Sequence, residues 1–504
     1  MHRRRTLLVS LVLAGFVAAF ASPAVLAASD SGGPMIVYLK APATADQLAK
    51  LQAKGFNVGV AYKNLPAVSG NLPQGRIASV STLDFVVRVA PDTPRELHGG
   101  GGALRDEGDV TPIPLASTYN LDFIDRENTA ARGAGVYVAI LDSGLVSNWR
   151  DYLDAGRVRY DLGRAFTGAN GNTVPDMLAR DRGGHGTATS ATVIGYKLHD
   201  KSQTGQFGLL FNEPATGTKG TYSVPGVAPE ATIIPVRVCD VGVYCWDSSI
   251  FSGLDYVVSL KKGDAANGEL KGKPFVINLS LGGPSSSLEE EAVYKAVTDA
   301  GVLVVASAGN SGDAGMGWPG AYPVVISVAA GGWRKQFYGA ETTLNNQWWL
   351  DDVPEGEASV AEWFVVWWSS RQDANRGQEL DVTATGRFML LPYLWSGKAV
   401  VPADPEPADG IPSEYTYISG TSFSAPTTAG VVALMLSVNP GLTQAQAEAI
   451  LRATALPLPA DTWDAGFPFP ARNAWDASKS LGGLGTKTGW GLVQADGAVD
   501  AADA

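Results

Sequence analysis

Three residues of the sequence carry side chains that together could perform nucleophilic catalysis: Asp142, His185 and Ser422. Ser422 lies in a Gly-Thr-Ser-Phe-Ser-Ala-Pro stretch, and the small apolar run that follows it, 427–436, is typical of a buried helix. A serine hydroxyl becomes a good nucleophile when an imidazole accepts its proton, and a buried carboxylate on the other ring nitrogen fixes the tautomer of that imidazole. These residue types therefore predict acyl transfer, provided that the fold brings them together.

Each of the three residues also has a simpler interpretation. Ser422, taken alone, is more often a helix N-cap than a nucleophile. Asp142 follows an apolar run and could be an ordinary turn residue, and His185 could be a structural histidine that opens a helix of small residues. The chemical hypothesis depends on finding all three types together.

The scarcity of histidine narrows the choice of a base. The chain has four histidines. His2 lies in a predicted targeting segment, His98 is placed with a presumed linker, and His199 lies in a polar loop. His185 is therefore the well-placed candidate.

A fourth residue, Asn310, could stabilise the charge that develops on a carbonyl oxygen under attack. It lies in Ala-Ser-Ala-Gly-Asn-Ser-Gly after an apolar run, and its side-chain amide is a suitable donor for such an oxyanion. The alternative is an ordinary Asn-Ser-Gly turn.

The elements that must position these residues alternate between strands and helices. Short apolar runs that end in Gly, Ser or Asp indicate buried parallel strands, and amphipathic segments between them indicate helices. Such alternation predicts an α/β fold with a mainly parallel sheet covered on both faces, and an active site beyond the carboxyl ends of the strands. The predicted strands are 136–141, 231–238, 275–281 and 301–306, and the predicted helices include 288–300 and 444–455.

Four motifs in a fixed order resemble those of subtilisin-type serine proteases, the subtilases. They are Ile-Leu-Asp-Ser-Gly at 140–144, Gly-His-Gly-Thr at 184–187, Ala-Gly-Asn at 308–310 and the serine motif at 420–426. The order acid, base, nucleophile is that of subtilisin and differs from that of α/β-hydrolases. The resemblance covers roughly residues 118–500 and implies a three-layer subtilisin-like fold.

The resemblance also implies a role for each site residue. Asp142 would orient His185, His185 would act as base and then acid, and Ser422 would attack the scissile carbonyl. Asn310 and the Ser422 backbone N–H would form the oxyanion hole. Ser280, Leu281 and Gly282 would be one substrate-binding edge and 244–248 the other, while Ala306 and Gly309 would line a primary pocket for a sizeable apolar side chain.

The N-terminal part of the chain is expected to be removed. A basic start, an apolar run and small residues predict a signal peptide at 1–27 rather than a membrane anchor. Residues 28–98 look like a small α+β, ferredoxin-like propeptide, and the glycine-rich linker 99–117 is expected to hold the maturation site. The catalytic domain would then span 118–504. The predicted product is a secreted endopeptidase, extracellular or periplasmic, made as a self-processing zymogen.

Two further features are less typical of the family. Seven tryptophans lie in a segment of about 332–410, which is expected to be a structural excursion on the core rather than a substrate-contacting lid. Cys239 and Cys245 are the chain's two cysteines. In an exported protein they favour a local disulfide over free thiols. The chemistry needs no cofactor, and structural calcium is compatible with the family but not predicted.

Composition limits the partners. A net charge of −12 argues against nucleic acid and anionic membrane surfaces. We expect protein or peptide substrates, the chain's own propeptide as an intramolecular inhibitor, no membrane association after signal removal, and a monomer. Two alternative functions stay open: a catalytically idle binding protein of the same fold, and a restricted processing or transpeptidating enzyme.

Overall fold

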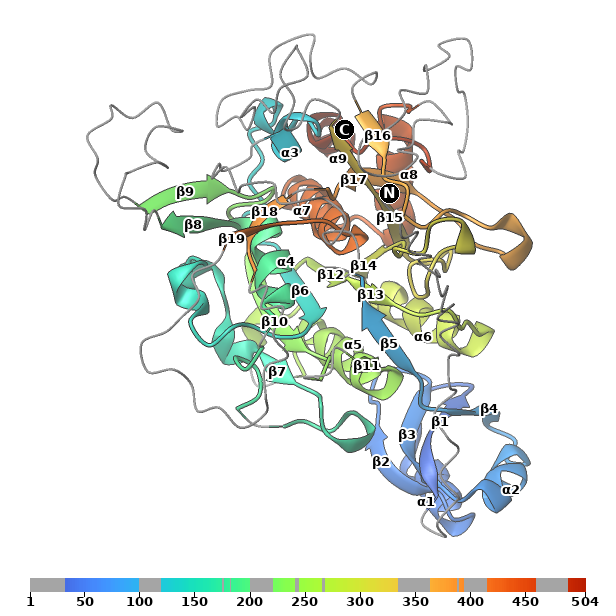
Figure 1. Cartoon of the computed structure of the whole chain (residues 1–504). Coiled ribbons are helices and arrows are strands. Elements are labelled where there is room, and N and C mark those ends of the chain that lie inside the picture. The colour runs from blue at the N-terminus through green and yellow to red at the C-terminus, as the bar shows by residue number, and fades with distance from the viewer. Residues whose placement is uncertain are drawn as a thin grey trace, which may run out of the picture.

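The computed structural model describes residues 32–98, 119–174, 176–181, 183–199, 221–240, 244–264, 268–333, 363–387, 389–393, 415–458 and 488–504. The predicted signal peptide, the whole of the predicted linker and much of the tryptophan-rich segment lie outside the described residues. Two units of structure are present, an N-terminal unit and a larger α/β body (Figure 1).

The N-terminal unit is built on a four-stranded antiparallel sheet in the order β2-β3-β1-β4. Its elements follow each other as β-α-β-β-α-β, which is the ferredoxin-like arrangement. The first helix begins where the sequence indicates, because Thr44 and Gln47 form a reciprocal capping box. The elements are β1 (Gly33–Leu39), α1 (Ala45–Ala53), β2 (Asn57–Ala61), β3 (Ala67–Leu72), α2 (Ile77–Ser81) and β4 (Val86–Pro91).

The α/β body is organised on an eight-stranded sheet in the order β16-β15-β14-β12-β6-β10-β7, with β17 also pairing β15. All of its pairs are parallel except that of β15 with β16. The predicted parallel sheet is confirmed. The strands are β6 (Tyr137–Asp142), β7 (Arg164–Ala165), β10 (Thr232–Arg237), β12 (Phe275–Leu279), β14 (Val302–Ser307), β15 (Ile326–Trp333), β16 (Trp363–Val365) and β17 (Val382–Thr385).

Helices cover both faces of this sheet, as the continuous apolar strands require. Along β6, Val138 and Ile140 join one hydrophobic core and Ala139 and Leu141 join the other. The first core includes buried residues of α4 and α7, and the second those of α5 and α6. The three layers are therefore helix, sheet and helix. The helices are α3 (Tyr119–Asp122), α4 (His185–Ile194), α5 (Asp247–Lys262), α6 (Leu288–Asp299), α7 (Thr421–Val438), α8 (Gln444–Thr454) and α9 (Ala495–Asp503).

The central helix α7 is long and apolar enough to cross a membrane, but 89% of its apolar window is buried inside the protein. It packs against β12, β14 and β15 and against α4. Its apolar composition is therefore explained by its place in the core, as the sequence predicted for 427–436.

Three smaller sheets complete the described part of the chain. One of them joins the two units, because β5 of the N-terminal unit lies between β11 and β13 of the body (Figure 1). The other two are hairpin-like ribbons. The strands are β5 (Pro94–Leu97), β11 (Tyr244–Trp246), β13 (Leu281–Gly282), β8 (Gly195–His199), β9 (Thr221–Pro225), β18 (Met389–Pro392) and β19 (Tyr415–Ile418).

The described part of the tryptophan-rich segment packs on the core. Trp333 and Trp363 are paired across β15 and β16 and are fully buried, and the ring of Phe123 lies against both. Trp368 is also buried, whereas Trp367 is 45% exposed. In this part, the segment extends the main sheet, as expected for a structural excursion. Trp348, Trp349 and Trp395 lie outside the described residues.

Candidate active site

Asp142 and His185 form a directed pair in the interior of the body. The imidazole Nδ1 lies 2.8 Å from Oδ1 and 2.9 Å from Oδ2 of Asp142. Asp142 is completely buried and His185 is 2% exposed. A buried carboxylate at Nδ1 favours the tautomer that carries its proton there, which leaves Nε2 free to accept a proton. Among the described residues, Nε2 of His185 has no hydrogen-bond partner.

The local fold explains why these two residues meet. Asp142 is the last residue of β6, and His185 is the first residue of α4. The helix approaches the strand end closely at Gly186, where a Cβ atom would lie 2.2 Å from the carbonyl oxygen of Gly144. Only glycine permits this approach. The Ser143 hydroxyl then accepts from the Gly186 N–H at 3.0 Å and ties the two elements together.

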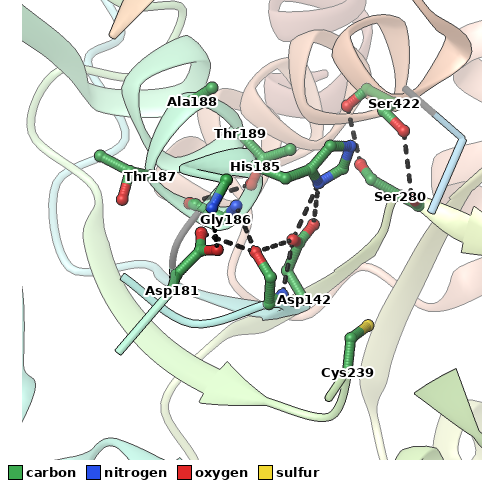
Figure 2. A network of polar contacts seen from close by, with 12 residues as sticks. Asp142, Asp181, His185, Gly186, Thr187, Ala188, Thr189, Cys239, Ser280 and Ser422 are labelled. Atoms are coloured by element: carbon green, nitrogen blue, oxygen red, sulfur yellow. Dashed lines mark hydrogen bonds and ion pairs between the residues drawn. The ribbon is translucent and has the colours of Figure 1, made fainter. Parts of the chain in front are cut away.

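Ser422 lies at the start of α7 beside the same histidine. Figure 2 shows the imidazole between Asp142 and Ser422, with its distal nitrogen on the serine side. In this state the Ser422 hydroxyl donates to the carbonyl of Ser280 at 3.0 Å, and the Ser280 hydroxyl donates to the carbonyl of Ser422 at 2.7 Å. The second bond is available because Pro426, four residues on, has no N–H to offer that carbonyl.

Asn310 lies beside the start of α7. Its Oδ1 accepts from the N–H and the hydroxyl of Thr421 at 3.0 and 2.9 Å. These two bonds fix the amide so that Nδ2 points the other way, where it donates to the carbonyl oxygen of His98 at 2.5 Å. The Ser422 backbone N–H donates to the same oxygen at 3.2 Å. Two donors therefore converge on one carbonyl oxygen of the N-terminal unit.

The segment that delivers this carbonyl is the strand β5. Leu97 and Glu96 pair antiparallel with Leu281 and Gly282 of β13. On its other side, β5 pairs with Tyr244–Trp246 of β11. The N–H of His98 donates to the carbonyl of Ser280 at 3.1 Å. The expected substrate-binding edges at 280–282 and 244–248 are therefore both occupied by an extended segment of the chain itself.

His98 requires a correction, because the sequence placed it with a linker. Its Nδ1 lies 2.7 Å from the Ser307 hydroxyl, and its ring packs against Gly282 and Gly317. A Cβ at position 282 would lie 2.4 Å from Cε1 of this ring, so glycine makes the space for it. Burial, and secondarily the nearby His185, lowers the pKa of His98 to about 4. Its imidazole is therefore neutral at neutral pH.

The residues around the His98 ring differ in part from those expected for the primary pocket. Ser307, Gly282 and Gly317 contact the ring. Gly309 is close by, and a Cβ there would meet Ser370 and Gly317. Ala306 is buried in β14 and belongs to the core on the α5 and α6 face of the sheet. The sequence did not show which of the adjacent residues Ala306 and Ser307 lies beside the pocket.

Three residues before His98, the Arg95 side chain is almost completely buried at 2% exposure. Its Nε lies 2.7 Å from Oδ1 of Asp247, and its Nη2 lies 2.7 Å from Oε2 of Glu290. Burial raises the pKa of Glu290 to about 7 despite the opposing effect of Arg95. Neither acid was singled out in the sequence, although each lies in the first turn of a predicted or observed helix.

A disulfide joins Cys239, just after β10, to Cys245 in β11. It closes a short loop and links β11, the strand that pairs with one side of β5, to the main sheet.

Three carboxylates gather in one cluster of the described residues. Glu379, Asp381 and Glu448 have ligand atoms within 4.8 Å of one another. The guanidinium of Arg452 contacts all three, including Glu379 at 2.6 Å and Glu448 at 2.5 Å. Because a cation is already provided by the chain, this donor set does not fit a calcium ion as it stands.

Comparisons with known proteins show the family of the chain. Residues 133–491 match the Peptidase_S8 subtilase family. Subtilisin DY of Bacillus licheniformis is 28% identical over 346 residues, which are 67% of this chain and 90% of that protein. Subtilisin E of Bacillus subtilis is 27% identical over 330 residues, which are 64% of this chain and 61% of that protein.

Solved structures show the same fold. Fervidolysin from Fervidobacterium pennivorans, a keratinolytic enzyme related to subtilisin, gives a TM-score of 0.57 at 22% identity. That match covers 93% of this chain and 61% of fervidolysin. Sphericase gives a TM-score of 0.50 at 20% identity, over 76% of this chain and 98% of that chain. The chain therefore matches about three fifths of the length of fervidolysin.

The family match and the similarity to subtilisins place the chain in the class of serine-type endopeptidases. Within that class, this chain belongs to the subtilase family.

Proposed function

We propose that the protein is an exported endopeptidase, made as a precursor that cleaves itself between His98 and Gly99. The observation that carries this proposal is the carbonyl of His98, held by Asn310 and the Ser422 N–H while residues 94–97 lie as a strand between two edges of the body. This is the arrangement that a peptide substrate needs for attack by Ser422.

The proposed mechanism begins with a rotation of the Ser422 hydroxyl from the Ser280 carbonyl to Nε2 of His185. As Oγ attacks the carbonyl carbon of His98, its proton passes to Nε2, and Asp142 stabilises the imidazolium. The negative charge on the His98 oxygen is stabilised by Asn310 Nδ2 and the Ser422 N–H at the positive end of α7.

The tetrahedral intermediate then collapses. His185 returns the proton to the nitrogen of Gly99, which leaves as a new amino terminus, and His98 stays attached to Ser422 as an ester. Water, deprotonated by His185, hydrolyses this ester and restores the serine. No cofactor enters these steps.

In this proposal the N-terminal unit is a propeptide that also inhibits the enzyme. Its inhibition is supported by contacts away from β5. The Asp92 carboxylate accepts from the N–H and hydroxyl of Ser248 at 3.0 and 2.6 Å, in the first turn of α5. The Asp255 carboxylate, further along that helix, accepts from the N–H groups of Lys63 and Asn64. These contacts would keep the unit bound after a single peptide bond is cut.

Export rests on the sequence of residues 1–27 and on the disulfide, since disulfides persist in oxidising compartments.

The test compares the precursor with its Ser422→Ala variant. We expect the wild-type chain to yield a body that begins at Gly99, as read by N-terminal sequencing, and to label with a fluorophosphonate probe. Ser422→Ala should stay unprocessed and unlabelled. Ser424→Ala, in the same motif and the same helix, is the matched control and should process normally. Processing of the Ser422→Ala chain in a purified preparation would contradict the proposal.

A further inference from the structure

The Arg95 guanidinium is bound by groups that all belong to the α/β body. Nε and Nη2 contact the two oxygens of Asp247 at 2.7 and 3.4 Å, and Nη2 contacts Glu290 at 2.7 Å. Nη1 donates to the carbonyl of Ser285 at 2.8 Å, with the Trp318 carbonyl at 3.5 Å. The site therefore contacts all three nitrogens of the guanidinium.

The two acids are buried where a cation stabilises their charged forms. Their side chains are 5% and 4% exposed, and they face the same guanidinium from the starts of α5 and α6. Tyr322 donates to Glu290 Oε2 at 2.8 Å and holds it in place. The other oxygen of Glu290 is buried and has no hydrogen-bond partner among the described residues. Buried carboxylates without a cation are costly, so the site favours a positively charged occupant.

We propose that Asp247 and Glu290 form an arginine subsite, with which the mature enzyme selects substrates that carry arginine as the fourth residue before the cleaved bond. This inference rests on the proposed function, because it takes residues 94–98 as bound in the manner of a substrate. The subsite stays with the body when the N-terminal unit leaves, so the preference extends from self-processing to the cleavage of other proteins.

The geometry favours arginine over lysine. The contacts lie on different sides of a planar fork, with Asp247 at one edge, Glu290 at the end and the carbonyls at the other edge. A lysine ammonium is a single point of charge and cannot reach all of these groups at once. A neutral residue of similar length would leave both carboxylates without a counter-charge.

The inference is tested on the mature enzyme with four quenched fluorescent peptides. Each has the sequence Pro-Xaa-Glu-Leu-His-Gly of residues 94–99, with arginine, lysine, citrulline or leucine at the variable position. The active-enzyme concentration is measured by fluorophosphonate labelling of Ser422. We expect kcat/KM for the arginine peptide to exceed those for citrulline and leucine by about a hundredfold or more, with lysine in between.

Variants locate the preference. Glu290→Gln and Asp247→Asn should each lower the arginine-to-citrulline ratio of kcat/KM by at least about tenfold. Glu291→Gln, the next residue of α6 and outside the subsite, should keep the ratio of the wild type. The arginine-to-citrulline ratio of kcat/KM is independent of the fraction of enzyme that is folded. If a variant does not fold, the wild-type series of four peptides decides the question alone.

Two results would overturn the inference in different ways. An enzyme that labels at Ser422 and cleaves all four peptides within about threefold of each other has no arginine subsite, although the proposed function survives. Absence of both labelling and cleavage overturns the inference together with the proposed function.

Discussion

The side-chain amide of Asn310 donates to the backbone carbonyl oxygen of His98 at 2.5 Å. These residues are far apart in the sequence and come from different units of the structure. In the proposed precursor, this bond defines which carbonyl is polarised, and therefore which peptide bond Ser422 would attack.

The first prediction concerns this donor. Asn310→Ala should lower kcat by about 10²–10³-fold, the loss measured for the corresponding donor in a subtilisin, because the oxyanion loses one of its two hydrogen bonds. KM should change little, because the substrate can still pair with β11 and β13 in the way that β5 does. Steady-state kinetics on a peptide substrate provides the measurement. Asn375→Ala, an exposed change, is the control, and equal kinetics for the two variants would show that Asn310 is only structural.

The second prediction concerns the carboxylate behind the histidine. Asp142→Asn keeps the shape of the site but would place an amide donor or a neutral acceptor at Nδ1, so that the imidazole adopts the wrong tautomer. We expect kcat to fall by about 10⁴-fold, as for the equivalent exchange in another Ser-His-Asp protease. The surface variant Asp151→Asn should retain the wild-type rate. A loss below about tenfold in Asp142→Asn would argue against the orienting role.

The third prediction concerns pH. The pKa of His98 falls from its ordinary 6.5 to about 4 in the bound state, so the free segment takes up a proton first as the pH is lowered. Binding is therefore strongest above about pH 6.5 and weakens as the pH falls from 6.5 towards 4.

A synthetic peptide of residues 93–98 can be measured as an inhibitor of the mature enzyme across this range. A peptide with glutamine at the last position is the control, because titration of the enzyme affects both peptides equally. We expect the ratio of their inhibition constants, histidine peptide over glutamine peptide, to rise by up to about tenfold per pH unit below 6.5. A ratio that is constant with pH would refute the assignment.

The fourth prediction concerns the disulfide. Replacing both Cys239 and Cys245 by serine should destabilise the protein by about 2 kcal/mol, because the short loop is no longer closed in the unfolded chain. KM should also rise, because β11 is one of the two strands that pair with β5 and that would pair with a substrate in its place. Thermal unfolding and peptide kinetics test the two effects separately. Unchanged stability and KM would mean that the loop is held by its other contacts.

Much of the fold could be predicted from the sequence because its signals are local. The apolar runs at 136–141 and 301–306 correspond to β6 and β14 within one or two residues, since continuous burial on both faces demands continuous apolar sequence. The structure also brings Asp142, His185, Ser422 and Asn310 to one edge of the sheet, as their motifs indicated.

The contacts between the two units could not be predicted in this way. Arg95 and His98 belong to a short polar stretch beside a glycine run, which looks like a linker by composition. Their partners, among them Asp247 and Ser307, are more than a hundred residues away. Nothing in the local pattern of either partner indicates such an encounter, which depends on the docking of complete units.

The sheet formed by β11, β5 and β13 has a consequence for any protein that the enzyme attacks. A segment can become the middle strand only if its own backbone N–H and C=O groups are released from their helix or sheet over at least five residues. The enzyme would therefore respond first to local unfolding of its target and only afterwards to its side chains. Resistance to such an enzyme would then be a property of a target's folding stability as much as of its sequence.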